Sequence, residues 1–245
     1  MGRGWTRVAD VLWPRVCAVE SCARTSDRQG RHICSRCFAT LPFHEAGGAC
    51  SICGGLVAAD VKHDFVCEYC QTERPAYEFA RSAVLYEEPV DRLVQDFKFR
   101  RATWLCEDLT DLLEGAVRAK LDFAGIDVVM PIPLHPNRER ERGYNQSALL
   151  AESLARRLVR RVDCRSLVRV VDTEHQARLS GDARRNNLRN AFEVPDPRWT
   201  RGRTVLLVDD VMTTGATLSH AARALLKAGA GRVWCATVAR AVLRS

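Results

Sequence analysis

The sequence predicts an α/β protein with a mostly parallel sheet, preceded by a small cysteine-rich module. Two observations support this prediction. Eight of the eleven cysteines lie between Cys17 and Cys70, and beyond residue 75 short apolar runs alternate with amphipathic segments. Strands that alternate with helices are typical of a parallel sheet covered by helices on both faces. We therefore expect two domains, residues 1–75 and 76–245, with enough chain to bury a substantial core.

The elements of the second domain follow from hydrophobic periodicity. Leu218, Ala221, Ala222 and Leu225 recur at helical spacing, and glycines follow them, as at the end of a helix. By the same reasoning we expect helices at 89–100, 104–121, 144–161 and 216–231. Apolar runs predict strands at 80–86, 126–133, 166–171, 203–210 and 232–239.

Composition and charge limit the classes of function. No apolar stretch is long enough to span a bilayer and the N-terminus lacks a signal peptide, so we expect a soluble cytosolic protein without membrane insertion. The formal charge is +7. Eight thiolates that hold two zinc ions add eight negative and four positive charges, which lowers the total to +3. Basicity alone is therefore weak evidence for a nucleic-acid partner.

The spacing of the first eight cysteines predicts structural zinc sites. They form one CxxxxC pair and three CxxC pairs: Cys17 and Cys22, Cys34 and Cys37, Cys50 and Cys53, Cys67 and Cys70. Two such pairs supply four thiolates in the tetrahedral geometry of zinc, with no open position for catalysis. Pairing in chain order and interleaved pairing both fit, and buried or redox cysteines are the alternative. His32, His44 and His63 lie nearby and could replace a ligand, although a lone histidine near a zinc site is more often unliganded; Cys106, Cys164 and Cys235 are expected in the core.

The stretch VLLVDDVMTTGAT, residues 205–217, predicts a site for a ribose phosphate. Ligands of parallel sheets bind beyond the carboxyl ends of the strands, where Asp209 and Asp210 stand. The loop that follows leads into the start of a helix, which favours an anion. Its threonines, Thr213, Thr214 and Thr217, offer hydroxyl donors, and Gly215 permits close approach of the backbone.

This arrangement resembles the 5-phosphoribosyl 1-pyrophosphate (PRPP) signature of type I phosphoribosyltransferases. The resemblance implies that Asp209 and Asp210 hold the ribose hydroxyls and that PRPP arrives with Mg²⁺. It also implies a 5′-phosphate loop of Thr213, Thr214, Gly215, Ala216 and Thr217. The alternatives are a strand that ends in a solvated turn and the acidic strand of a P-loop ATPase. The second is disfavoured because no lysine follows a glycine, so the GxxxxGK[ST] motif is absent from the sequence.

A second anion site is expected for the pyrophosphate of PRPP. The stretch VVMPIPLHPNRERERGYNQ follows a predicted strand and carries Arg138, Arg140, Arg142, Asn145 and Gln146. Arginine matches phosphate oxygens in pairs. An exposed charged loop, in which the intervening glutamates pair with the arginines, is the alternative. Lys98 is either a further phosphate contact or a solvated lysine.

The cysteine-rich head, the stretch DFKFR and the stretch HQARLSGDARRNNLRNAF together resemble the ComF/GntX family. The pattern QxxLSxxxRxxN recurs as Gln176, Leu179, Ser180, Arg184 and Asn187, although His175 stands where a proline is common. The resemblance implies a zinc finger joined to a phosphoribosyltransferase-type domain of the Rossmann-like kind, and a role in DNA uptake. We expect 176–187 to be a mobile loop in which Arg184 meets the pyrophosphate.

Two functions follow from these patterns. The first is a phosphoribosyltransferase that uses magnesium PRPP and a nitrogen acceptor. The second is a protein that binds nucleotides or single-stranded DNA without turnover, as a partner of the DNA-uptake machinery. Arg156, Arg157, Arg160 and Arg161 favour the second, but they fall on the polar face of a predicted helix, where solvation is the default.

Overall fold

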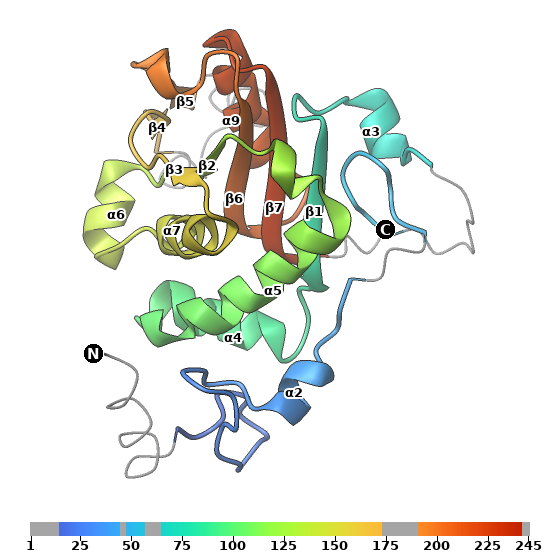
Figure 1. Cartoon of the computed structure of the whole chain (residues 1–245), viewed down its shortest axis with the longest axis vertical. Helices are drawn as coiled ribbons and strands as arrows, with labels where there is room; N and C mark the ends of the chain where they lie inside the picture. Colours follow the sequence, from blue (N-terminus) through green and yellow to red (C-terminus); the bar gives the residue numbers. More distant parts are fainter. Residues whose placement is uncertain (1–14, 45–47, 57–64, 173–190, 242–245) are drawn as a thin grey trace.

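The centre of the molecule is a five-stranded parallel sheet with the strand order β1-β7-β6-β2-β3 (Figure 1). The computed structural model describes residues 15–44, 48–56, 65–172 and 191–241. The strands of this sheet are β1 (Phe79–Leu85), β2 (Val128–Pro131), β3 (Arg161–Val162), β6 (Thr204–Met212) and β7 (Arg232–Arg240). A separate antiparallel pair joins β4 (Val168–Arg169) and β5 (Phe192–Glu193). The prediction of a mostly parallel α/β sheet is confirmed.

Helices cover both faces of the sheet, as the alternation of the sequence predicted. One face carries α4 (Val90–Phe99), α5 (Cys106–Lys120) and α7 (Gln146–Leu158), and the other carries α9 (Ala216–Lys227). The shorter helices are α2 (Ser35–Ala39), α3 (Glu68–Thr72), α6 (Pro136–Arg142) and the 3₁₀ turns η1 (Thr103–Leu105), η2 (Phe123–Gly125) and η3 (Pro197–Trp199). Alternate side chains of β6 enter opposite core layers because successive residues of a strand point to opposite faces.

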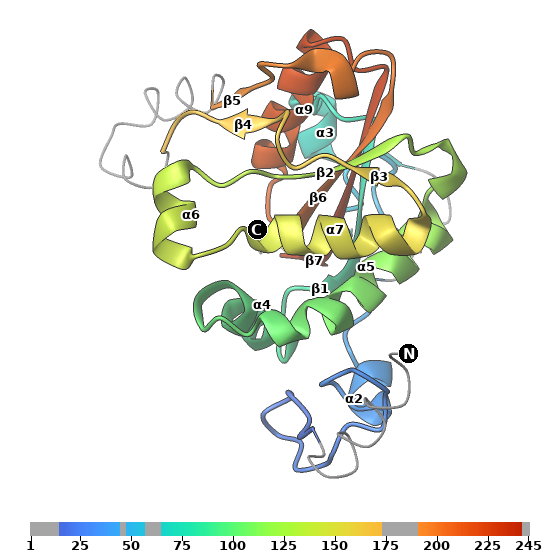
Figure 2. The same ribbon diagram turned by 60° about the vertical axis from the view of Figure 1, so that its left-hand side comes forward.

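The cysteine-rich segments lie at two separate places (Figures 1 and 2). We call residues 15–44 the first cysteine module and residues 48–56 with 65–72 the second. The first packs below α4 and α5, and its buried residues join the core layer of those helices. The second lies beside β1 and contributes to the layer that contains α9. The sheet therefore has one cysteine module associated with each of its two core layers.

The structure corrects three details of the sequence analysis. Helix α7 ends at Leu158, and Val159 follows with a φ of 55°, so Arg160 and Arg161 lie beyond the helix. The strand that carries the acidic pair continues to Met212 instead of stopping at residue 210. The core expectation is wrong for Cys164, which is exposed. In the part of the chain that the structure describes, the helices are too short or too polar to cross a membrane.

Candidate functional site

The acidic pair lies near the carboxyl end of β6, a central strand. Asp209 accepts a hydrogen bond from the Ser147 hydroxyl at 2.7 Å, and the Nζ of Lys98 lies 2.8 Å from Oδ1 of Asp210. Asp210 is 2% exposed, and its other oxygen, Oδ2, is buried without a hydrogen-bond partner. A buried acceptor without a donor costs free energy. This end of β6 therefore holds an unfilled acceptor beside a fixed positive charge.

The environment of Asp209 opposes its ionisation. Burial and, after it, the negative charge of Asp210 together raise the pKa of its carboxyl to about 7, against the opposing effects of the Ser147 hydrogen bond and Lys98. Lys98 supplies one positive charge beside the two adjacent carboxyl groups, so ionisation of both would leave one negative charge in excess. Ligand hydroxyl donors or a cation would relieve this repulsion.

The loop after β6 leads into α9 through Gly215. Any other residue at this position would force the neighbouring side chains to move. Gly215 is the N-cap of α9 and has a φ of 83°. A Cβ atom on Gly215 would lie 2.4 Å from Met212 Cε and 2.8 Å from the Tyr77 hydroxyl. Glycine has no side chain to cap the helix, and the Ala216 N–H group donates instead to the Thr214 hydroxyl oxygen at 3.3 Å, while the positive dipole end of the twelve-residue helix points at this loop. Thr213 is exposed, and Ala216, Thr214 and Thr217 are half-buried around this loop.

Beneath the loop lies a tyrosine that the sequence analysis did not select. Tyr77 is 3% exposed, and its hydroxyl is buried without a hydrogen-bond partner. Burial raises the pKa of this phenol well above its usual range, so the group keeps its proton. It is a neutral hydrogen-bond donor next to Gly215.

The arginines after β2 lie on α6, where polar neighbours already contact them. Arg138 donates to Glu141 at 3.0 Å, Arg140 donates to Asn137 at 2.5 Å, and Arg142 donates to Gln146. Pairing between arginine and glutamate was the alternative to a phosphate site. Among the described contacts, none joins these three arginines to the acidic pair.

Asn145 connects the same region to the segment that follows β2, and Gln146 accepts from Arg142. The side-chain oxygen of Asn145 caps α7 by accepting from the N–H groups of Ser147 and Ala148 at 2.9 and 3.3 Å, and its amide donates to the Ile132 carbonyl at 3.0 Å. This cap fixes the first turn of α7 and so positions the Ser147 hydroxyl against Asp209. Asn145 therefore acts on the acidic pair through Ser147.

The predicted mobile loop falls outside the described residues. This applies to its members Gln176, Leu179, Ser180, Arg184 and Asn187. Their contribution to a pyrophosphate site stays a prediction.

The structure groups the eight cysteines in chain order. One cluster contains Cys17, Cys22, Cys34 and Cys37, and the other contains Cys50, Cys53, Cys67 and Cys70. Within each cluster all four sulfur atoms lie within 4.8 Å of one another. Of the alternatives left open by the spacing, the structure has the sequential grouping, and no histidine of the described residues belongs to either cluster.

The geometry of both clusters fits a zinc ion. A Zn–S bond of about 2.3 Å places the sulfurs of a tetrahedral site about 3.8 Å apart. The Sγ atoms of Cys22 and Cys34 are 3.9 Å apart, and those of Cys53 and Cys67 are 3.7 Å apart. Backbone N–H groups point at the sulfurs, from Cys34 to Cys17 and from Cys67 to Cys50, at 3.4 Å each. Two structural zinc sites are therefore plausible on geometry as well as on spacing.

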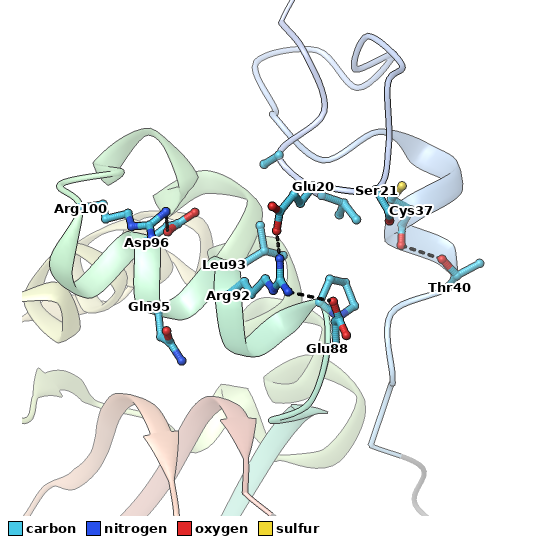
Figure 3. A pocket seen from close by; sticks show the side chains of 13 residues that line it. Glu20, Ser21, Cys37, Thr40, Glu88, Arg92, Leu93, Gln95, Asp96 and Arg100 are labelled. Carbon is cyan, nitrogen blue, oxygen red and sulfur yellow. Dashed lines mark hydrogen bonds and ion pairs between the residues drawn. The ribbon is translucent and has the colours of Figure 1, made fainter.

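A larger pocket of about 690 Å³ lies elsewhere, between the first cysteine module and α4 (Figure 3). Its charged side chains pair with one another: Arg92 with Glu20 and Glu88, and Arg100 with Asp96 at 3.3 Å. Because the pocket carries both signs of charge and contains neither the acidic pair nor the loop, we do not assign the phosphate ligand to it.

Comparison with known proteins supports the same assignment of the domain. Residues 145–242 match the family model described as a phosphoribosyl transferase domain. The chain is 32% identical to DNA utilization protein YhgH of Escherichia coli K12 over 204 residues, which cover 77% of this chain and 89% of that protein. It is 34% identical to Competence protein F of Haemophilus influenzae over 196 residues, which cover 78% and 84%.

A third relative extends the set to another bacterium. The chain is 29% identical to Competence protein ComFC of Bacillus subtilis over 206 residues, which cover 80% of this chain and 79% of that protein. The match with these relatives spans most of each protein. The chain belongs to the ComF/GntX family that its motifs predicted.

Proposed function

We propose that this protein binds magnesium PRPP at the end of β6 and transfers its phosphoribosyl group to a nitrogen nucleophile. The observation that carries the proposal is the juxtaposition of Asp209 and Asp210 with the start of α9. The carboxylates accept hydrogen bonds from the ribose hydroxyls. The first N–H groups of α9, with Thr213 and Thr214, donate to the 5′-phosphate.

The reaction needs positioning and charge stabilisation more than a strong base. A nitrogen lone pair forms a bond to C1 of the ribose while the C1–O bond to pyrophosphate breaks and its electron pair leaves with pyrophosphate. A proton carried by the nitrogen is released to solvent. The chain holds the ribose through Asp209 and Asp210, while Lys98 limits repulsion between the acidic pair and the polyanion.

Magnesium supplies neutralisation of the phosphate charge when it is bound. The unpartnered Oδ2 of Asp210 and the carboxyl of Asp209 are oxygen ligands of the type that Mg²⁺ prefers. The residues present therefore fit a metal-bound polyphosphate near β6.

Calorimetric titration of magnesium PRPP tests the proposal. The wild-type protein should bind, and Asp209→Asn/Asp210→Asn should lose at least 100-fold in affinity because both acceptors for the ribose hydroxyls change. Glu87→Gln/Asp122→Asn is the matched control, since it removes two exposed carboxylates outside the site and should bind as the wild type does. The absence of wild-type binding would refute the proposal.

A second candidate is binding of single-stranded DNA; one of the relatives is named a DNA utilization protein. Arg161 and Arg203 lie 3.9 and 5.1 Å from the ring centre of the partly exposed Trp199. Arginine beside an aromatic ring is typical of single-strand surfaces. Binding of a labelled oligonucleotide that weakens with salt and with Arg161→Ala, but not with Arg36→Ala at an exposed position of α2, would support this candidate. An oligonucleotide that does not bind at low salt would exclude it.

A further inference from the structure

A small cavity separates the second cysteine module from the phosphate loop. Its volume is about 170 Å³. The module contributes Leu56 and Tyr69, the loop contributes Thr214, and the end of β7 contributes Arg240. The cavity is therefore built from three parts of the chain that meet only in the folded protein.

The module is fixed against the sheet on this side. The Ala80 N–H of β1 donates to the Ile52 carbonyl at 2.7 Å, and Arg81 donates to the Ser51 carbonyl at 2.9 Å. A Cβ atom on Gly54 would lie 2.9 Å from the Ala80 carbonyl oxygen, so the two backbones are in close contact. Tyr69 follows the cluster ligand Cys67 by two residues. The wall that carries Tyr69 is therefore held by both the cluster and β1.

Arg240 joins the cluster to the loop. Its guanidinium donates to the Cys53 carbonyl at 2.6 Å and to Met212 Sδ at 3.2 Å, and one nitrogen lies 3.6 Å from Cys53 Sγ. These contacts use three of its five N–H groups. The residues that the structure describes give Arg240 no carboxylate partner. In a zinc-loaded cluster the Cys53 thiolate would face this charge, and two N–H groups of Arg240 take no part in these contacts.

The strand order places this cavity opposite the expected leaving group. In the sheet, β6 has β2 on one side and β7 on the other. Asn145 and Gln146 belong to the β2 side, where pyrophosphate is expected. The cavity lies on the side of β7 and β1. A nucleophile approaches a carbon from the face away from the leaving group, so it would come from the cavity.

The walls define the chemistry of the ligand. An apolar cavity of about 150 Å³ holds one benzene molecule, so this one has room for one ring with small substituents. Leu56 and Tyr69 offer apolar and aromatic contact to a flat ring. Arg240 offers donors to a carboxylate or an exocyclic oxygen.

We infer that this cavity binds the acceptor, a single-ring nitrogen heterocycle that bears a carboxylate or a carbonyl group, with the second cysteine module as one wall. The role of the ligand as an acceptor rests on the proposed PRPP site, whereas binding of a ring in the cavity does not depend on that site. The second module thus contributes directly to substrate binding, whereas the first does not reach the cavity.

Calorimetry and saturation-transfer NMR test this inference on the zinc-loaded full chain. The probes are orotate, uracil and nicotinate, with adenine as a two-ring control, each with and without ribose 5-phosphate, which has no leaving group. At least one single-ring probe should bind ten-fold more tightly than adenine. Tyr69→Ala and Leu56→Ala should each weaken it at least five-fold, whereas Tyr69→Phe should stay within two-fold because the ring remains.

The result separates this inference from the proposed function. Magnesium PRPP is titrated into the same variants, and its affinity should change less than two-fold in Tyr69→Ala. Loss of probe binding with retained PRPP binding supports the cavity assignment. Failure of all three single-ring probes, or equal binding by wild type, Tyr69→Ala and Leu56→Ala, overturns it whatever PRPP does. Zinc content and thermal unfolding verify that each variant is folded.

Discussion

The two cysteine modules have the same ligand set but are attached to the protein in different ways. Both make main-chain hydrogen bonds to β1, the first through Pro42 and His44 and the second through Ile52. The first is held in addition by charge: Arg28 and Arg31 of the module pair with Asp108 and Asp111 of α5, and Asp108 also accepts the N–H group of His32 at 2.8 Å. The second is held in addition by the side chains of Arg81 and Arg240, which donate to its main-chain carbonyls. The first module therefore stabilises the helical layer, and the second belongs to the candidate site.

Under the proposed acceptor site, a structural cysteine cluster acquires a functional role through its neighbours. Both clusters are closed four-cysteine sets with no open coordination position. Only the second lies against residues that also touch the phosphate loop. Whether the chain divides after residue 75 stays a prediction, because both modules share core layers with the sheet.

Disruption of each cluster separately tests whether the two modules differ in their effect on ligand binding. Structural zinc contributes on the order of 10 kcal/mol in small zinc-binding peptides, so Cys34→Ser/Cys37→Ser and Cys50→Ser/Cys53→Ser should each lose one zinc ion and unfold one module. We expect the second pair to weaken magnesium PRPP binding more than ten-fold and the first less than three-fold. Zinc analysis and calorimetry measure both quantities. Equal losses would contradict the functional difference.

Removal of one buried carboxylate should loosen the first module alone. Asp108 is fully buried, and it accepts from Arg28 and from the N–H groups of His32 and Ile33. Breaking a buried charge pair costs about 3 kcal/mol, so Asp108→Asn should lower the free energy of unfolding by about that much. Zinc release to a chelator should accelerate for one of the two ions. The exposed Glu68→Gln of the second module is the control, and acceleration for both ions would argue against separate attachment.

The candidate site should reduce stability in a pH-dependent way. Because the folded pKa of Asp209 is raised to about 7, the unfolded chain loses this proton at lower pH than the folded chain does. Stability contributed by the protonated form is therefore lost as pH rises from about 4 to 7. Asp209→Asn should stabilise the protein by on the order of 2 kcal/mol more at pH 7.5 than at pH 5.5. Urea unfolding at both values measures this, and a pH-independent difference would exclude the raised pKa.

The sequence predicted the parts of this comparison that depend on local pattern. Helical periodicity located α9, and cysteine spacing identified both clusters. The glycine and threonines after β6 also follow from local rules, since a left-handed glycine at a helix start is a local requirement. The grouping of the cysteine pairs into clusters was left open because spacing alone does not fix which pairs meet.

Contacts between distant segments explain what the sequence analysis missed. Ser147 lies 62 residues before Asp209, and Arg240 lies 187 residues after Cys53. Tyr77 and Tyr69 have no motif around them, and only the packed structure places them at the loop and the cavity. The sequence left two roles open for Lys98, a phosphate contact and a solvated lysine. The fold places its ammonium group against Asp210.

The smallest effect is expected for charges on the outer side of the first module. Arg92 of α4 pairs with Glu20 and Glu88, but the three side chains are 55, 74 and 73% exposed (Figure 3). Exposed ion pairs contribute less than about 1 kcal/mol because water and salt screen them. Arg92→Ala should therefore leave zinc content and magnesium PRPP affinity unchanged and shift urea unfolding only slightly. A loss as large as that of Asp108→Asn would show that the module is held across its whole interface with α4 and α5, and that burial does not decide which charges matter.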